Sequence, residues 1–217
     1  MAEVRKLAFI WDMDGTLVDS YPAIVPGVRT VCEEYGLRYS EEYIREYVLR
    51  SSVGTLLEEI SREYGLDLKE LKSRFNTVND ANVAAIRPIP HVKEVLQALS
   101  DAGHLSFIYT HRGASCHTIL EQTGLRPFFT EVLTALDGFP RKPEPDAILH
   151  LVEKYALLAD HCFYVGDRSL DIEAACNAGI RSILYLDPAS PLKPTGLETH
   201  VVHDLREIPE IVRQITV

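Results

Sequence analysis

The 217-residue sequence has few of the features that mark secreted, membrane or zinc-binding proteins. Its four cysteines are scattered and form no CxxC pattern, which argues against a disulfide framework or zinc site and is typical of reduced thiols. No apolar run reaches the length of a membrane-spanning helix. The short apolar run near the amino terminus ends in a carboxylate, unlike a secretion signal. We therefore expect a cytoplasmic protein.

Basic residues are also in the minority. The 22 lysines and arginines face 32 aspartates and glutamates, so the formal net charge is -10. Such a charge argues against a nucleic-acid polymer or an anionic membrane as a partner. An anionic substrate would need local cations or a metal ion. The hydrophobic content of 46% is that of an ordinary globular protein, with room for one large domain or a domain with an insertion.

Five short apolar runs have the composition of parallel strands buried on both faces. They cover residues 7–11, 105–110, 131–136, 162–167 and 181–186. Amphipathic helical patterns separate them, and two of these patterns end at Gly103 and Gly124, a residue type favoured just past a helix. Strands that alternate with helices predict an α/β fold with a doubly wound parallel sheet.

The stretch from residue 19 to residue 83 breaks this alternation. It contains four amphipathic helical patterns and no strand pattern, and the proline-containing segment 87–92 marks the return to the sheet. The sequence therefore predicts an α/β core domain of residues 1–18 and 84–217, with an inserted all-helical domain of residues 19–83. We expect the insertion, which follows the first strand directly, to act as a lid over that strand's end.

Two carboxylates, Asp12 and Asp14, follow the first strand two positions apart. Residues at this spacing in a strand point to the same side. Two like charges in a partly dry site repel each other, and a divalent cation is the usual means of offsetting the repulsion. The pair therefore indicates a site for chemistry, with a divalent cation as the usual candidate to offset the repulsion.

Further polar residues stand at or after the ends of other predicted strands. The carboxyl ends of parallel strands meet at one edge of the sheet, which is where ligands bind. The polar residues are Thr110, Lys142, Asp167 and Asp171, where Arg141 is an alternative to Lys142 and Asp171 could instead be an acid that stabilises a helix start. A carboxylate can act as a nucleophile toward phosphorus, and a second one can transfer protons. Mg²⁺ neutralises crowded oxygens, and an ammonium and a hydroxyl group can donate to a phosphoryl group. Each residue type of the set would therefore have a physical task if the reaction were phosphoryl transfer.

The segments DMDGTLVDS, YTHR, RKPEP and VGDRSLD resemble, in order, the four motifs of the haloacid dehalogenase-like superfamily. The insertion is similar to the helical cap of the phosphoglycolate phosphatase and β-phosphoglucomutase group. The resemblance implies a Rossmann-like core with a cap, and a Mg²⁺-dependent phosphatase that hydrolyses a small cytosolic phosphomonoester. Dehalogenases of this superfamily lack the second aspartate, so Asp14 disfavours that activity.

The same resemblance implies residue roles. Asp12 is the nucleophile that forms an aspartyl-phosphate, Asp14 is the general acid and base, and Thr110 and Lys142 hold the phosphoryl group. The implied Mg²⁺ ligands are Asp12, the backbone carbonyl of Asp14, Asp167 and Asp171. The sequence departs from the family pattern at Arg168, where serine is common, and at His91, where glycine is frequent.

Four residues are candidates for binding the rest of the substrate. His111 and Arg112 follow Thr110, although His111 has a surface or packing role as its alternative. Arg50 and Ser51 stand at the start of a stretch of small residues in the insertion. An arginine there could clamp a second anionic group of the substrate. Arg45 is a weaker candidate, and a solvated helix position is the alternative for both insertion arginines.

Two other functions remain open. A phosphomutase would return the phosphoryl group to a sugar, and a phosphoacceptor signalling domain would keep it on the aspartate. Thr16 favours a phosphatase over a mutase, because the related mutases tend to carry valine there. The implied partner is a small phosphorylated metabolite, and the chain is expected to be a monomer or a homodimer.

Overall fold

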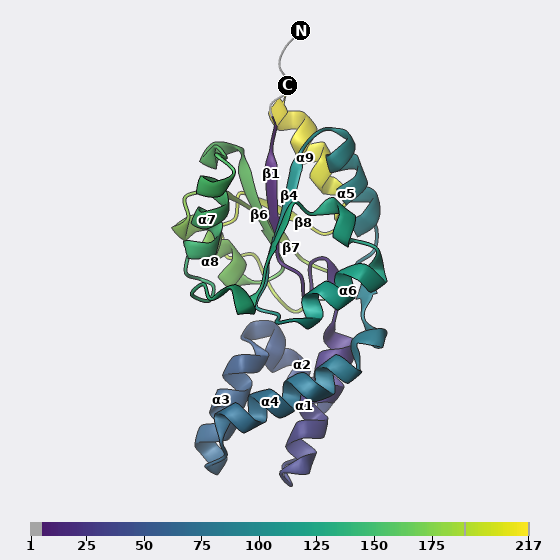
Figure 1. Ribbon diagram of the computed structural model, residues 1–217, viewed down its shortest axis with the longest axis vertical. Coiled ribbons are helices and arrows are strands. Elements are labelled where there is room, and N and C mark those ends of the chain that lie inside the picture. The colour runs from purple at the N-terminus through teal and green to yellow at the C-terminus, as the bar shows by residue number, and fades with distance from the viewer. Residues whose placement is uncertain (1–5, 189, 217) are drawn as a thin grey trace. The chain divides into compact units, whose positions relative to one another are not determined.

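The computed structural model describes residues 6–188 and 190–216, which divide into two compact units (Figure 1). The described residues up to Val18 and from Pro88 onward form the first unit, and Asp19–Arg87 form the second. The second unit continues four residues beyond the predicted end at residue 83. The reason is a 3-10 turn, Val83–Ala85, which packs against two helices of that unit.

The first unit contains a six-stranded sheet in the order β5-β4-β1-β6-β7-β8, in which each pairing is parallel. The strands are β1 (Ala8–Trp11), β4 (Leu105–Tyr109), β5 (Glu131–Leu133), β6 (Cys162–Gly166), β7 (Arg181–Tyr185) and β8 (His200–Val202). The chain begins with the central strand β1 and adds β4 and β5 on one side. It then returns to the centre and adds β6, β7 and β8 on the other side. This order confirms the predicted doubly wound α/β fold.

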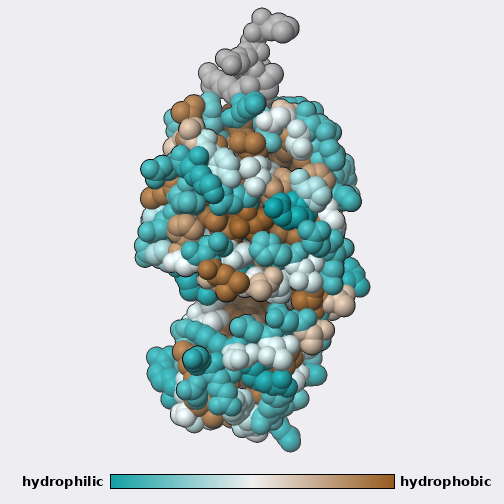
Figure 2. Space-filling view, in the orientation of Figure 1, coloured by the Kyte–Doolittle hydropathy of each residue, from teal (hydrophilic) through white to brown (hydrophobic). Residues whose placement is uncertain are grey.

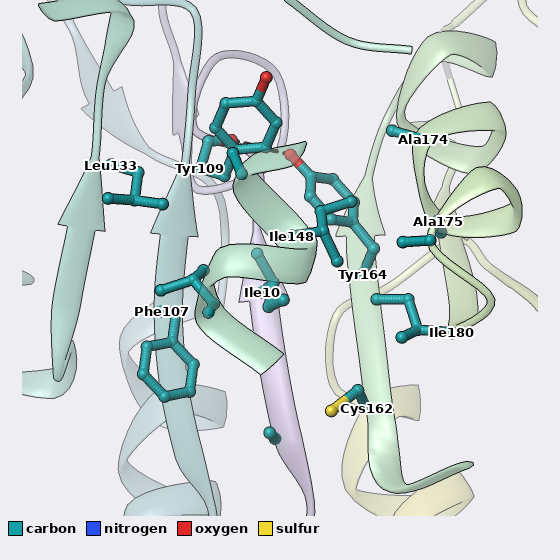
Figure 3. Packing of buried hydrophobic residues seen from close by; sticks show 14 residues of the cluster. Ile10, Phe107, Tyr109, Leu133, Ile148, Cys162, Tyr164, Ala174, Ala175 and Ile180 are labelled. Carbon is teal, nitrogen blue, oxygen red and sulfur yellow. Dashed lines mark hydrogen bonds between the residues drawn. The ribbon is translucent and has the colours of Figure 1, made fainter. Parts of the chain in front are cut away.

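Helices cover both faces of this sheet (Figure 1). They are α5 (Val92–Asp101), α6 (Ser115–Thr123), α7 (Asp146–Lys154), α8 (Ser169–Asn177) and α9 (Glu207–Thr216). On one face, α7 and α8 pack against the middle strands, and Figure 3 shows Ile148 of α7 close to Ile10 of β1. On the other face, Phe9 stacks on Phe163 with ring centroids 5.5 Å apart. Burial on both faces explains why the strands read as continuous apolar runs.

The second unit is all-helical. Its helices are α1 (Tyr21–Glu34), α2 (Glu41–Arg50), α3 (Val53–Tyr64) and α4 (Leu68–Ala81). Ser40, Ser52 and Asp67 cap three of them by accepting a hydrogen bond from the backbone N–H three residues later. The two chain connections between the units, β2 (Val18–Asp19) and β3 (Arg87–Pro88), pair with each other as short strands.

Hydrophilic side chains cover much of the face seen in Figure 2, with apolar residues visible between them. Within the described ranges, the helices are too short or too polar to span a bilayer.

The fold generates a prediction about His104, which is buried just before β4. Its Nδ1 accepts a hydrogen bond from the backbone N–H of Leu7 at 3.2 Å. Burial lowers the pKa of His104, so the folded protein favours the neutral ring. As the pH falls below the ordinary histidine value of about 6.5, the unfolded chain takes up this proton first. The free energy of unfolding should therefore decline from pH 6.5 downward, until the pH reaches the lower folded-state pKa.

We expect His104→Gln, whose amide oxygen can still accept from Leu7, to make this decline shallower. Urea denaturation at pH 7.5 and at pH 5.5 measures the difference. His117→Gln replaces an exposed histidine and serves as the control. The same pH dependence in His104→Gln and in the unmodified protein would contradict the assignment.

Candidate active site

The turn after β1 brings the first motif to the carboxyl edge of the sheet. The backbone N–H of Asp12 donates to the carbonyl of Val165 in β6, and that of Gly15 donates to the carbonyl of Val18. Gly15 has a φ of +87°, and a Cβ at this position would lie 2.2 Å from Oδ2 of Asp167. Glycine is therefore required here for two reasons, the backbone conformation and the close approach of a carboxylate.

Three buried carboxylates meet at this edge. Asp12, Asp167 and Asp171 each place one oxygen within 4.8 Å of the others. Gly166 allows the third to approach, because a Cβ there would lie 2.4 Å from the Cβ of Asp171. Burial raises the pKa of Asp167 to about 7, and the charges of Asp12 and Asp171 add to that effect. Thr16 Oγ1 donates to Asp167 Oδ1 at 3.2 Å.

Lys142 supplies the nearest positive charge. Its Nζ lies 2.6 Å from Asp12 Oδ1 and 2.6 Å from Asp171 Oδ1, and it donates to the Tyr164 hydroxyl at 3.0 Å. That hydroxyl in turn donates to the backbone carbonyl of Tyr109. Burial opposes the charge on Lys142, but the attraction of Asp12 and Asp171 outweighs it and raises the pKa of the ammonium. The side chain is therefore a fixed cation at the carboxylate cluster.

Arg168 adds a second cation. Its Nη2 lies 3.7 Å from Asp12 Oδ2 and its Nε lies 4.0 Å from Asp167 Oδ1. Three carboxylates against two cations leave one negative charge in excess when all are ionised. Asp12 Oδ2 is buried and has no hydrogen-bond partner among residues 6–188 and 190–216. Excess charge, an unsatisfied buried oxygen and an all-oxygen donor set fit a hard divalent cation such as Mg²⁺.

Asp14 lies in a different environment. Arg112 Nε donates to both of its carboxylate oxygens at 3.1 Å, and Arg112 Nη2 donates to Oδ1 at 2.6 Å. Within the described ranges, the Asp14 carboxylate is outside the group of three that could share a metal ion. The two aspartates of the motif therefore have separate partners, Lys142 for Asp12 and Arg112 for Asp14.

Thr110 and His111 lie at the end of β4. Thr110 is buried, and its Oγ1 accepts from the backbone N–H of Arg112 at 3.1 Å. His111 Nε2 accepts from the backbone N–H of Lys142 at 2.7 Å, and its Nδ1 lies 3.0 Å from Arg141 Nη2. Burial, together with the charges of Lys142 and Arg141, lowers the pKa of His111 to about 2. A neutral His111 therefore fixes the loop that carries Lys142.

The two insertion residues expected to contact substrate belong to the helical unit. Arg50 ends α2 with its side chain 68% exposed, and its Nη2 lies 3.9 Å from Glu46. The backbone N–H of Ser51 donates to the carbonyl of Tyr47. The Arg45 guanidinium stands over the ring of Tyr21, 5.5 Å from its centroid.

Two residues that contact the charged groups of this site, Tyr164 and Arg168, were not assigned a role from the sequence. Tyr164 lies inside an apolar strand, where a tyrosine is ordinary core material, so no local signal pointed to its contact with Lys142. Arg168 stood out only as a departure from the family pattern. Its position directly after Asp167 was the signal that could have placed it beside the carboxylates.

Comparisons with known proteins show what the sequence is similar to. A family model described as haloacid dehalogenase-like hydrolase matches residues 9–185. The chain is 34% identical over 193 residues to a phosphoglycolate phosphatase of Vibrio parahaemolyticus, covering 83% of this chain and 82% of that protein. It is 25% identical over 219 residues to the pyrophosphatase PpaX of Oceanobacillus iheyensis, covering 96% and 97%.

Solved structures share the fold. A predicted phosphoglycolate phosphatase from Haemophilus somnus superposes with a TM-score of 0.83 at 22% identity, covering 95% of this chain and 97% of that one. A HAD-superfamily hydrolase from Geobacter sulfurreducens gives a TM-score of 0.73 at 24% identity, covering 95% and 96%.

The close approach at Gly15 can be tested by substitution. Gly15→Ala should destabilise the protein and weaken Mg²⁺ binding, because the added methyl group displaces the Asp167 carboxylate. Gly138→Ala is the matched control, since Gly138 has a φ of +78° but no atom of the described residues within 4 Å of where the methyl group would lie. The control should cost about 1–2 kcal/mol for the left-handed backbone alone. Gly15→Ala should cost about 1–3 kcal/mol more through overpacking.

Urea denaturation and calorimetric Mg²⁺ titration measure the two effects. Equal destabilisation of the two variants, with unchanged Mg²⁺ affinity, would contradict the claim that the Asp167 carboxylate can take its position only because Gly15 lacks a side chain.

Proposed function

This chain belongs to the haloacid dehalogenase-like hydrolase family and is a phosphatase-type enzyme, and from that premise we propose that it hydrolyses a small phosphomonoester with Mg²⁺ through an aspartyl-phosphate on Asp12. The observation that carries the proposal is the buried group of Asp12, Asp167 and Asp171, with Lys142 2.6 Å from the first and the last. We also propose that the enzyme works in the cytoplasm.

In the first half of the reaction, an Asp12 oxygen bonds to phosphorus as the bond from phosphorus to the leaving alcohol oxygen breaks. Asp14 gives its proton to that oxygen. In the second half, Asp14 takes a proton from water, the water oxygen bonds to phosphorus, and Asp12 is released with inorganic phosphate as the product. Lys142 and Thr110 donate hydrogen bonds to the phosphoryl oxygens and stabilise their charge.

Asp12, Asp167, Asp171 and the backbone carbonyl of Asp14 are the proposed holders of Mg²⁺. When bound, the ion supplies charge neutralisation and orientation of the phosphoryl oxygens. The protein itself supplies the dry environment. Because the carboxylates are buried and carry one negative charge in excess, they need a cation before an anionic substrate can approach them.

Charge and similarity support a small anionic phosphate ester as the substrate class. The curated relatives include phosphoglycolate phosphatases and a pyrophosphatase, whose named substrates are small phosphorylated anions. In a chain of net charge -10, Lys142 and Arg168 offset two of the three negative charges at the cluster, so a bound divalent cation would make the site net positive. The helical unit is proposed to act as the cap, and its Arg50 and Ser51, with His111 of the core, as contacts of the non-reacting part of the substrate.

Hydrolysis is favoured over a mutase reaction or a long-lived phosphoryl mark. Asp14 is proposed to take a proton from water, which releases the phosphoryl group instead of keeping it on Asp12. Thr16, which the related mutases tend to replace with valine, donates to Asp167. A fully aliphatic side chain at this position would forfeit that hydrogen bond.

The proposal is tested with Asp12→Asn. An amide is not a nucleophile toward phosphorus, so hydrolysis of p-nitrophenyl phosphate with Mg²⁺ should fall to background, while the urea midpoint stays the same or rises because one buried charge is gone. Asp146→Asn, which neutralises an exposed aspartate at the start of α7, should keep full activity. Removal of Mg²⁺ with EDTA should abolish the activity of the unmodified enzyme, and added Mg²⁺ should restore it. Substantial turnover by Asp12→Asn would overturn the proposed role.

A further inference from the structure

The strongest contact not required by the proposed roles joins Arg112 to Asp14. We propose that Arg112 is a positioning residue, which holds the Asp14 carboxyl group where it can exchange protons with the leaving alcohol and with water. The proposal rests on the proposed function and gives Arg112 a role besides the substrate contact expected from the sequence.

The geometry fixes both the place and the rotation of the Asp14 carboxylate. Nε of Arg112 is shared between the two oxygens at 3.1 Å, and Nη2 donates to Oδ1 at 2.6 Å. A planar guanidinium that donates two parallel hydrogen bonds sets an orientation that a single point charge cannot set. The Arg112 side chain is only 5% exposed, whereas that of Asp14 is 22% exposed. The buried partner therefore holds the one that is open to solvent.

Arg112 is itself held at several points. Its backbone N–H donates to Thr110 Oγ1 at 3.1 Å, and its carbonyl accepts from the backbone N–H of Ala135 at 3.0 Å. At the far end of the side chain, Nη1 donates to Ser115 Oγ at 3.3 Å, at the start of α6. Arg112 is thereby anchored to the end of β4 and to the next helix. An anchored guanidinium restrains the position of the Asp14 carboxylate that it binds.

Asp14 needs such support because Lys142 does not hold it. The ammonium contacts Asp12 and Asp171, so it fixes the nucleophile and leaves the second aspartate of the motif to another partner. A proton can be transferred only within hydrogen-bond reach of the reacting oxygen, and acid–base catalysis of this kind contributes about 10²–10⁴-fold. Misplacement of a catalytic group by about 1 Å can cost 10²-fold.

The role predicts a dependence on the leaving group. The value of kcat/KM reports steps up to departure of the leaving alcohol. An alkoxide needs a proton from Asp14 to leave, whereas p-nitrophenolate leaves with little acid assistance. Loss of Arg112 should therefore lower kcat/KM for alkyl phosphates far more than for p-nitrophenyl phosphate. A contact between Arg112 and an anionic substrate group would instead affect only substrates that carry such a group.

The test compares Arg112→Met with the unmodified enzyme on three substrates: ethyl phosphate, phosphoglycolate and p-nitrophenyl phosphate. We expect kcat/KM to fall about tenfold or more for the first two and less than about threefold for the third, within the range of acid–base catalysis. Arg181→Met removes an arginine from the amino end of β7 and is the matched control, with no selective loss. A loss confined to phosphoglycolate, or an equal loss on all three, would overturn the positioning role.

A double-mutant cycle with Asp14→Asn completes the test. If Arg112 acts through Asp14, Arg112→Met should reduce kcat/KM for ethyl phosphate no further in the Asp14→Asn background. Additive losses would contradict the proposal, while Asp14→Asn alone would still show the leaving-group dependence. If Asp14→Asn itself leaves ethyl phosphate hydrolysis intact, the proposed acid–base chemistry fails and the role of Arg112 fails with it. Urea denaturation of each variant separates these outcomes from misfolding.

Discussion

The repulsion among three buried carboxylates is the constraint on which the rest of the site depends. Asp12, Asp167 and Asp171 converge at one sheet edge because Gly15 and Gly166 have no side chains to keep them apart. Lys142 offsets part of the charge at 2.6 Å. Removing Lys142 would leave two buried carboxylates without their shared partner, a kind of change that typically costs about 3–5 kcal/mol, whereas neutralising one carboxylate relieves repulsion. The cluster's remaining negative charge and its unsatisfied Asp12 oxygen fit the divalent cation that we propose it holds.

The same constraint separates the two aspartates of the first motif. Asp12 is buried and paired with a lysine that also contacts Asp171, an arrangement suited to a fixed nucleophile. Asp14 is partly open to solvent and held by a guanidinium, an arrangement suited to a group that meets water. One strand-to-turn segment thus provides two carboxylates with different partners, Lys142 for Asp12 and Arg112 for Asp14, and this difference supports the two proposed roles.

The central strands and the family could be predicted from the sequence, because each depends on residues that are close together in the chain. The apolar runs fixed the central strands, and the motif order identified the family. The short edge strand β8 (His200–Val202) was not predicted, since three residues show no periodicity. The run 131–136 ends early as a strand, because Thr134 caps a 3-10 turn. The pair Arg112–Asp14 joins residues 98 positions apart, so only the fold could reveal it.

The proposed bond between Asp12 and phosphorus can be trapped chemically. The enzyme is mixed with Mg²⁺ and a phosphomonoester, quenched in acid within milliseconds, and treated with borohydride, which reduces an acyl phosphate to an alcohol. Peptide mass spectrometry then locates the reduced residue. Reduction at residue 12, dependent on substrate and on Mg²⁺, is the predicted result. Reduction at Asp14 or Asp167 instead, or turnover without any reducible acyl phosphate, would contradict the assignment of Asp12 as the nucleophile.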